Sequence, residues 1–432
     1  MTKASKRPQV VIVGGGFGGL AAAKRLAGRD VDVTLIDRRN HHVFQPLLYQ
    51  VATAALSPAD IAAPIRSILR RAKNVRVLLD GVCAVFPDAR HVMLESGRAL
   101  PYDWLILATG ARHSYFGRDD WARHAPGIKS IEDALAVRRR VLLALERAET
   151  EQNRRVRDSL LTFVVIGGGP TGVEMSGAIA ELARQAVSRD FRSITPHCSR
   201  VVLIEAGERL LPSFPKFLSK RTARSLRQLG VEVRLGAPVT EVGPHHVRVG
   251  RDPIMTYTTV WAAGVEASPA AEWLGVRSDR SGRVIVASDL TIPDHPTIFA
   301  IGDTAAAPDG RGGMLPGVAP VAKQQGRYVA DRILGRTGAP FRYRDRGNLA
   351  TIGRSRAVAE LGRLRLWGLP AWLMWSAAHV WFLIGFRSRM AVTLNWLWNY
   401  LTYHRSARLI TGEVIAPAMQ PRCAQSLERK CA

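Results

Sequence analysis

The chain of 432 residues is long enough for two or three domains that each bury their own core. Its formal net charge of +25 indicates an acidic partner surface, either anionic lipid or nucleic acid. No two of the four cysteines form a CxxC pair, so neither a redox dithiol nor a metal site is indicated, and a reducing compartment fits. Cys423 and Cys431, near the tail, are expected to stay free thiols.

A glycine-rich loop follows the first predicted strand, an apolar run at 10–13 that argues against a signal peptide. The loop reads Gly14, Gly15, Gly16, Phe17, Gly18 and Gly19. In dinucleotide-binding folds the first glycine makes the tight turn, the second admits the pyrophosphate, and the third lets helix pack on strand. The pyrophosphate then lies at a helix N-terminus, where free N–H groups favour anions.

The next predicted strand, at 31–37, ends in Asp37, a carboxylate placed to hydrogen-bond the hydroxyl groups of a ribose. A later strand at 104–107 runs into an Ala-Thr-Gly turn that contains Thr109 and Gly110. A charged helix is then expected over about 131–157. It carries Arg138, Arg139 and Arg140, which we interpret as a solvated face.

A second glycine-rich loop begins about 150 residues after the first and contains Gly167, Gly169 and Gly172. Its second strand ends in Glu205. Two such loops suggest two dinucleotides, one a permanently bound redox cofactor and the other a substrate that binds and dissociates in each turnover. A carboxylate at Glu205 would repel a 2′-phosphate, which favours NADH over NADPH, whereas the nearby Arg209 could accept that phosphate.

Glu174 lies two residues past the last glycine of the second loop, in the first turn of the predicted helix. The helix dipole alone would stabilise a carboxylate there. The functional interpretation is contact with the nicotinamide ribose or ring of NADH. Hydride transfer itself needs no protein acid or base, because a flavin supplies the chemistry and the protein sets ring distance and orientation.

The chain is expected to return to the first domain through a strand at 297–301, which is followed by Gly302 and Asp303. A carboxylate on such a turn can hold the ribityl hydroxyl groups of a flavin. Together with the first glycine loop and the Ala-Thr-Gly turn, this pair predicts bound FAD.

The segment from about 341 onward differs in composition and holds six of the ten tryptophans. Its almost wholly apolar stretch at 371–386 would reach about 24 Å as a helix, whereas a spanning helix needs roughly 20 residues. We therefore expect this stretch to lie in the membrane interface, which suits tryptophan. Four arginines are expected to contact lipid phosphates: Arg387, Arg389, Arg405 and Arg408. The alternative is a buried core or dimer helix.

Together these elements predict an α/β fold with two Rossmann-like dinucleotide-binding domains, the second inserted in the first, plus a C-terminal amphipathic membrane-attachment region. The FAD-binding domain is expected at 1–125 and 280–340, and the inserted NADH-binding domain at 126–279. The membrane-anchoring region is expected at 341–432.

The run HHVFQPLLYQ at 41–50 resembles a near-identical His-x-Phe-x-Pro-Leu-Leu-Tyr-Gln run of the type II NADH:quinone oxidoreductases. Segments 261–265, 299–303 and 382–400 are also similar to signatures of that family, and the resemblance covers nearly the whole chain. It implies a single-subunit, non-pumping respiratory flavoprotein that oxidises NADH through FAD and reduces a membrane quinone. It further implies a homodimer, peripheral on the cytoplasmic face of the cell membrane.

The resemblance also implies site residues. FAD would contact the first loop together with Asp37, Arg38, Pro46, Val82, Thr109, Gly110, Asp303, Ala319 and Pro320. NADH would contact Gly167, Gly169, Gly172, Glu174, Glu205 and Gly264. The quinone pocket would be lined by 319–326, where many members have glutamine in place of Pro320. Only Gln324 keeps the paired-glutamine pattern, and with Glu174 it is predicted to be catalytic.

Three other interpretations compete with this one. A sulfide:quinone oxidoreductase shares the scaffold but needs redox cysteines near the flavin, and Cys83 and Cys198 are isolated. A ferredoxin-type reductase would not need the tryptophan-rich tail. A basic NADH-binding flavoprotein with a nucleic-acid partner would explain the charge, but no nucleic-acid module appears, so we expect a lipid surface and no nucleic acid.

Overall fold

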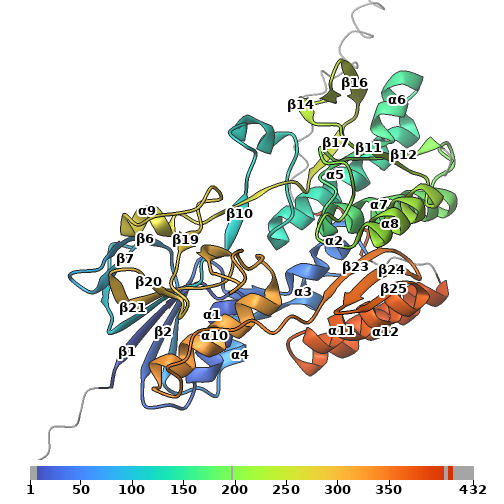
Figure 1. Cartoon of the computed structure of the whole chain (residues 1–432). Coiled ribbons are helices and arrows are strands. Elements are labelled where there is room, and N and C mark those ends of the chain that lie inside the picture. Colours follow the sequence, from blue (N-terminus) through green and yellow to red (C-terminus); the bar gives the residue numbers. More distant parts are fainter. Residues whose placement is uncertain (1–6, 196–197, 403–406, 412–432) are drawn as a thin grey trace, which may run out of the picture.

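The computed structural model describes residues 7–195, 198–402 and 407–411 (Figure 1). Arg405, Cys423 and Cys431, for which the sequence makes predictions, lie outside the described residues. The main parts of the fold are a six-stranded sheet that is parallel except for its antiparallel edge strand β20, a four-stranded parallel sheet, and a C-terminal sheet with two helices. Figure 1 shows the first sheet at the left, the second at the upper right, and the C-terminal helices below the second.

The first sheet has the order β20-β21-β9-β1-β2-β5 and takes strands from both ends of the nucleotide-binding part. Its strands are β1 (Gln9–Val13), β2 (Asp32–Asp37), β5 (Val75–Leu79), β9 (Trp104–Leu107), β20 (Thr291–Ile292) and β21 (His295–Ala300). The central strands are apolar along their length because both faces are covered. The helices α1 (Phe17–Leu26) and α10 (Ala319–Ile333) pack on each other beside it. An antiparallel meander shares its core: β6 (Val82–Phe86), β7 (His91–Leu94) and β8 (Ala99–Pro101).

The second sheet is parallel, in the order β13-β12-β11-β17. Its strands are β11 (Thr162–Ile166), β12 (Arg200–Ile204), β13 (Val231–Arg234) and β17 (Thr258–Trp261). The helices of this part are α5 (Ile131–Thr150), α6 (Arg154–Leu160), α7 (Pro170–Asp190) and α8 (Lys216–Gln228), and a further meander comprises β14 (Val239–Val242), β15 (His246–Val249) and β16 (Asp252–Met255). Strands β10 (Ala111–His113) and β18 (Val265–Ala267) pair where the chain leaves and re-enters the first part. The second unit is therefore inserted in the first.

Shorter strands and helices lie between these main elements. They are β3 (His41–Val43), η1 (Gln45–Leu47), α2 (Leu48–Ala52), α3 (Pro58–Ile61), β4 (Ala62–Pro64), α4 (Ile65–Leu69), η2 (Asp119–Arg123), α9 (Ala270–Leu274), β19 (Val284–Ile285), η4 (Gly302–Thr304) and β22 (Ala305–Ala306).

The prediction of one solvated helix over 131–157 is wrong. The helix ends at Thr150, and α6 begins after Asn153, whose side chain accepts hydrogen bonds from the first N–H groups of that helix. Arg138 is buried and donates to the carbonyl of Ala407. Arg140 donates to the carbonyls of Arg123 and His124. Hydrogen bonds from these side chains thus connect α5 to the segment at 123–124 and to the C-terminal part of the chain.

The C-terminal part contains a sheet that the sequence did not predict. Strands β23 (Asn348–Gly353), β24 (Arg356–Leu361) and β25 (Leu364–Gly368) form an antiparallel sheet that packs on α7. Two helices follow, α11 (Leu369–Phe382) and α12 (Phe386–Thr402), so the single apolar helix expected over 371–386 is wrong. The chain turns at Gly385, whose φ of +87° favours glycine. Within the described residues, no helix has both the length and the apolar character that crossing a membrane requires.

Candidate functional site

The first glycine loop has the geometry of a dinucleotide cradle. Gly14 adopts φ +105°, and a Cβ there would lie 2.2 Å from the carbonyl oxygen of Ala108. A Cβ on Gly19 would lie 1.9 Å from the carbonyl oxygen of Gly14. Position 19 must therefore be glycine for helix α1 to pack this closely on the loop. By contrast, a Cβ on Gly16 would meet nothing within 4 Å. The open side of the loop lies at the N-terminus of α1, where free N–H groups suit the pyrophosphate of FAD.

Asp37 closes this loop from the end of β2. Its Oδ2 accepts the N–H of Gly15 at 2.6 Å, and its Oδ1 accepts the N–H of Arg39 at 2.7 Å. The carboxylate therefore lies where a ribose hydroxyl is recognised in this fold. The side chain of Arg38 is ion-paired with Glu95 on the surface.

The second glycine loop repeats this geometry. Gly167 adopts φ +110°, and a Cβ on Gly172 would lie 1.7 Å from the carbonyl oxygen of Gly167. Glu205 occupies the position that Asp37 has in the first loop, because its Oε2 accepts the N–H of Gly168 at 2.5 Å. The Arg209 guanidinium donates to the carbonyls of Phe214 and Pro212, at 2.9 and 2.6 Å. It is thus engaged by backbone and not held out toward a 2′-phosphate.

The turn that carries Asp303 is tied to the Ala-Thr-Gly turn. The N–H of Gly110 donates to Thr304 Oγ1 at 2.8 Å, and the hydroxyl groups of Thr109 and Thr304 lie 3.2 Å apart. The N–H of Gly302 donates to the buried Gln325 side chain at 2.7 Å, a contact that the sequence analysis missed. The turn that follows β9 and the turn that follows β21 therefore lie together at the carboxyl ends of these two neighbouring strands.

The remaining predicted contacts occupy defined places in the fold. Ala319 and Pro320 form the first turn of α10, where proline is accommodated because its missing N–H has no helical acceptor. Pro46 lies in η1, Val82 is buried in β6, and Gly264 adopts φ +73° beside the ring of Phe116.

Gln324 is engaged by the protein itself. Its side-chain amide donates to the carbonyl of Arg344 at 2.9 Å and accepts the N–H of Arg344 at 3.0 Å. Both of its polar atoms are used to hold the segment between α10 and β23. This arrangement supports a bracing role more directly than the quinone contact that the sequence predicts.

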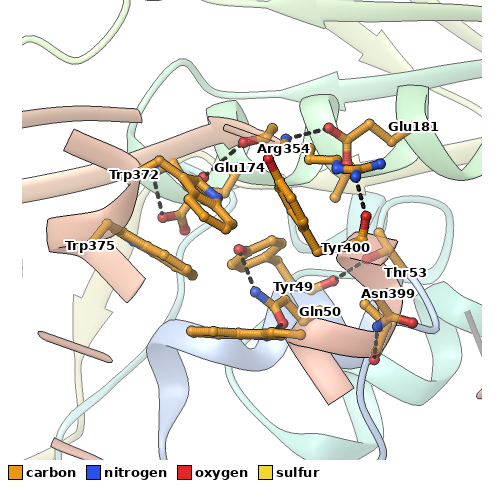
Figure 2. A pocket seen from close by; sticks show the side chains of 15 residues that line it. Tyr49, Gln50, Thr53, Glu174, Glu181, Arg354, Trp372, Trp375, Asn399 and Tyr400 are labelled. Atoms are coloured by element: carbon orange, nitrogen blue, oxygen red, sulfur yellow. Dashed lines mark hydrogen bonds between the residues drawn. The ribbon is translucent and has the colours of Figure 1, made fainter. Parts of the chain in front are cut away.

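A pocket of about 120 Å³ lies between the 41–50 motif, α7 and the C-terminal part. Figure 2 shows Tyr49 and Gln50 on one wall, Glu174 and Glu181 on another, and the rings of Trp372, Trp375 and Tyr400 around them. The other lining residues are Thr53, Ala55, Ala178, Thr351, Gly353, Arg354, Trp396 and Asn399.

Glu174 is the buried acid of this pocket, with its side chain directed into it (Figure 2). Burial raises the pKa of Glu174 to about 8, although the N–H of Thr351, 3.3 Å from Oε1, and the indole of Trp375 both favour the carboxylate. The indole nitrogen of Trp375 is itself buried and, within the described part of the chain, lacks full hydrogen-bond geometry with any acceptor. Near neutral pH the Glu174 carboxyl group therefore holds a proton.

A hydrogen-bond chain links the 41–50 motif to α12. Trp396 Nε1 donates to Gln50 Oε1 at 2.7 Å, and Gln50 Nε2 donates to the hydroxyl oxygen of Tyr49 at 2.8 Å. Trp375 stacks on Trp396 with ring centroids 5.3 Å apart. The motif is recognisable in the sequence, but the role of these side chains is not, because the partner indole lies more than 340 positions away.

Two basic side chains, one buried and one half-buried, lie beside the first loop. His42 Nδ1 is 2.9 Å from the carbonyl oxygen of Gly15, and burial lowers the pKa of His42 to about 4, so the ring is neutral and donates through Nδ1. The Lys323 ammonium lies over the rings of Phe17 and Phe382, each centroid at 4.9 Å. Burial, followed by repulsion from Arg327, lowers the pKa of Lys323 to about 8. The sequence analysis missed both groups.

Two glycine cradles, each closed by a carboxylate, define a flavoprotein of the pyridine nucleotide-disulphide oxidoreductase class, and the model of that family matches residues 8–326. A model described as the NDH2 C-terminal domain matches residues 346–404. The chain belongs to the type II NADH:quinone oxidoreductases, and its activity is the FAD-dependent oxidation of NADH with reduction of a quinone.

Sequence and structure comparisons agree on this family. The type II NADH:quinone oxidoreductases Ndh and NdhA of Mycobacterium tuberculosis are each 44% identical to the chain. Those alignments cover 94% and 95% of this chain, and 91% and 90% of the relatives. The structure of NDH2 from Plasmodium falciparum in complex with NADH has the same fold, with a TM-score of 0.86 at 21% identity over 94% of this chain and all of that one.

Proposed function

We propose that the pocket lined by Glu174 is where the quinone ring is reduced, and that Glu174 supplies a proton to it. Oxidation of NADH by a quinone consumes one proton: NADH, H⁺ and quinone give NAD⁺ and quinol. When bound, FAD relays the two electrons between the two substrates. The single observation that carries the proposal is a protonated, buried carboxyl group in a pocket built jointly by the nucleotide-binding part and the apolar C-terminal helices.

Each wall of the pocket has a chemical task in this proposal. Glu174 holds the proton on its carboxyl oxygen and gives it to a quinone oxygen as the electrons arrive. Gln50, held by Trp396, positions the hydroxyl group of Tyr49 at the pocket wall, where this hydroxyl group can orient the quinone ring. The indoles of Trp372 and Trp375 exclude water and provide flat apolar surfaces for the ring.

A second role for Glu174 rests on its position two residues after Gly172, in the first turns of α7. Contact with the nicotinamide half of NADH is the alternative to proton supply, and in that case loss of the carboxyl group would slow reduction of the flavin and not its reoxidation. The two roles affect different half-reactions and can be measured separately.

The test is stopped-flow spectroscopy of the flavin in the purified enzyme and in Glu174→Gln. Anaerobic NADH is added first and a quinone analogue second. We expect flavin reduction at nearly the wild-type rate and reoxidation by quinone slowed about 100-fold or more, on the scale of a lost general acid. Glu272→Gln, an exposed glutamate on α9, is the matched control. Slowed reduction with normal reoxidation would instead assign Glu174 to nicotinamide.

The apolar face of α12 supports attachment to a membrane. Phe386, Met390, Leu394, Leu397 and Leu401 recur at helical spacing and are all exposed. Together with Trp381 and Trp398 they form what we call the apolar face. A surface of this kind suits the interfacial region of a bilayer, and members of this family are peripheral membrane proteins.

The finer assignments belong to the same proposal. We place the enzyme on the cytoplasmic face of the membrane, where NADH is available, with a membrane quinone as its substrate and no nucleic-acid partner. The domain limits and the nucleotide contacts predicted from the sequence are retained, supported by the two cradles. A homodimer remains a prediction, and sedimentation velocity of the detergent-solubilised enzyme would test it.

A further inference from the structure

The arginines that the sequence assigns to lipid phosphates are largely used elsewhere. Arg408 is ion-paired with Asp190, and Arg389 donates to the carbonyl of Leu383 at 3.0 Å. Arg405 lies outside the described residues, and of the three arginines that the structure describes only Arg387 is exposed with no hydrogen bond or ion pair. A further group of cations beside the apolar face would strengthen its contact with anionic headgroups.

Such a group lies on α8 and the hairpin of β24 and β25. We call the following set the basic surface: Lys216, Lys220, Arg221, Arg224, Arg227, Arg363 and Arg365. The 13-residue α8 contains no acid, and its buried positions are Leu218, Ser219, Thr222, Ala223 and Leu226. The spacing of Lys216, Lys220, Arg224 and Arg227 puts them together on the outward stripe. Within the described residues no member of the set forms an ion pair.

The basic surface is held rigidly to the C-terminal part. Arg356 on β24 donates to the carbonyl of Ser225 at 3.3 Å and to Gln228 Oε1 at 3.0 Å, both near the end of α8. The guanidinium of Arg221 lies 5.1 Å from the ring centroid of Phe217 and 4.9 Å from that of Trp367. Helix α11 begins directly after β25, so the hairpin that carries Arg363 and Arg365 is joined to the two helices of the apolar face (Figure 1).

Exposed apolar side chains lie among these cations. Phe217, Leu364, Trp367 and Leu369 are 41%, 50%, 45% and 48% exposed. Unpaired cations interleaved with exposed aromatic and aliphatic groups match a phospholipid interface, where headgroup phosphates and acyl chains lie within a few ångströms of each other. A nucleic acid would engage the cations but leave these apolar groups and the adjoining apolar face in water.

We propose that the basic surface binds the headgroups of anionic phospholipids and docks the NADH-binding part onto the bilayer beside the apolar face. This inference rests on the membrane attachment proposed above. It assigns part of the large positive charge to one place on the molecule, and it makes the second nucleotide-binding unit a direct membrane contact alongside the C-terminal helices.

The test uses the full-length flavoprotein with Lys220→Gln, Arg224→Gln and Arg363→Gln combined. These side chains are exposed and form no hydrogen bond within the described residues. The matched control combines Arg251→Gln, Arg277→Gln and Arg280→Gln, which are also exposed and lie beside β16 and after α9, away from α11 and α12 (Figure 1). Both triple variants lose three positive charges. A difference between them in vesicle binding therefore reports the position of the charges and not the net charge of the protein.

Cosedimentation is measured with vesicles of phosphatidylcholine and with vesicles rich in phosphatidylglycerol, at low salt. A cation near an anionic surface is worth about fivefold in partitioning, so three should change it on the order of 100-fold. We expect that loss for the basic-surface variant on anionic vesicles only, and little loss for the control. Reduction of ferricyanide by NADH, unchanged in both, verifies that each variant is folded.

Equal losses in the two triple variants would overturn the proposal, and so would a basic-surface variant that binds anionic vesicles as the wild type does. Loss of binding to a DNA duplex with vesicle binding intact would assign the surface to nucleic acid and also overturn it. Failure of the membrane proposal itself looks different, because the wild type would then bind neither kind of vesicle.

Discussion

Replacing Glu174 by Gln should make the protein more stable at alkaline pH. Burial raises the pKa of Glu174 from 4.5 to about 8, so the folded protein binds a proton there that the unfolded chain releases across that range. Stability contributed by the protonated carboxyl group is therefore present below pH 4.5, declines as the pH rises, and is lost above pH 8. At about 1.4 kcal/mol per pH unit, ionising the buried group costs on the order of 5 kcal/mol.

Glutamine has the same shape and no charge, so it avoids this cost. For a chain of this length an unfolding entropy of about 2 cal/mol/K per residue makes 5 kcal/mol equivalent to roughly 5 °C in Tm. Glu174→Gln should accordingly melt within about 1 °C of the wild type at pH 5 and about 5 °C higher at pH 9. Other titrating groups are common to both proteins and cancel in the difference.

The measurement is thermal unfolding of the FAD-loaded enzyme, followed by circular dichroism at matched protein and FAD concentrations. Glu272→Gln on α9 removes an exposed carboxylate and should follow the wild type at both pH values. The reasoning fails if the difference in Tm between Glu174→Gln and the wild type is the same at pH 5 and pH 9, because the carboxyl group would then titrate normally in the folded protein.

Three further predictions concern the nucleotides and the membrane. Glu205→Gln should narrow the preference for NADH over NADPH by on the order of tenfold in kcat/KM, because charge repulsion of the 2′-phosphate is removed; an unchanged ratio would contradict it. Gly172→Ala should be purified with FAD but not be reduced by NADH, since its Cβ would meet the Gly167 carbonyl at 1.7 Å, and bleaching of the flavin absorbance by NADH would refute this. Phe386→Ser with Trp398→Ser should lose binding to phosphatidylcholine vesicles while keeping reduction of ferricyanide by NADH, and cosedimentation equal to that of the wild type would place the anchor elsewhere.

Local sequence was sufficient for the two nucleotide cradles. Gly14 and Gly167 need positive φ, and Gly19 and Gly172 need close backbone approach, so each cradle is specified by a few consecutive residues. The carboxylates Asp37 and Glu205 follow at the ends of adjacent strands, because parallel strands bring their carboxyl ends to one edge.

The C-terminal sheet could not be predicted in the same way. Its strands NLATIG and RAVAEL contain several small residues of low strand propensity, including Ala350, Ala357 and Ala359. These residues are fully buried because β23 packs closely on α7, where a Cβ on Gly177 would lie 1.7 Å from the carbonyl oxygen of Ile352. Packing between distant segments, and not local preference, makes this segment a sheet.

By itself, then, the sequence determined the fold class, the order of the two nucleotide units, the family and the cofactors, because these depend on contiguous motifs. Only the tertiary structure decided which polar side chains are free to act. In the folded protein, the side chains of Arg209, Gln324 and Arg140 donate hydrogen bonds to backbone carbonyls across a turn or in other segments. The residues next to them in the sequence do not indicate these partners. It also brings Glu174 into a pocket with Trp396, where burial, a property of the packed molecule as a whole, keeps its proton in place.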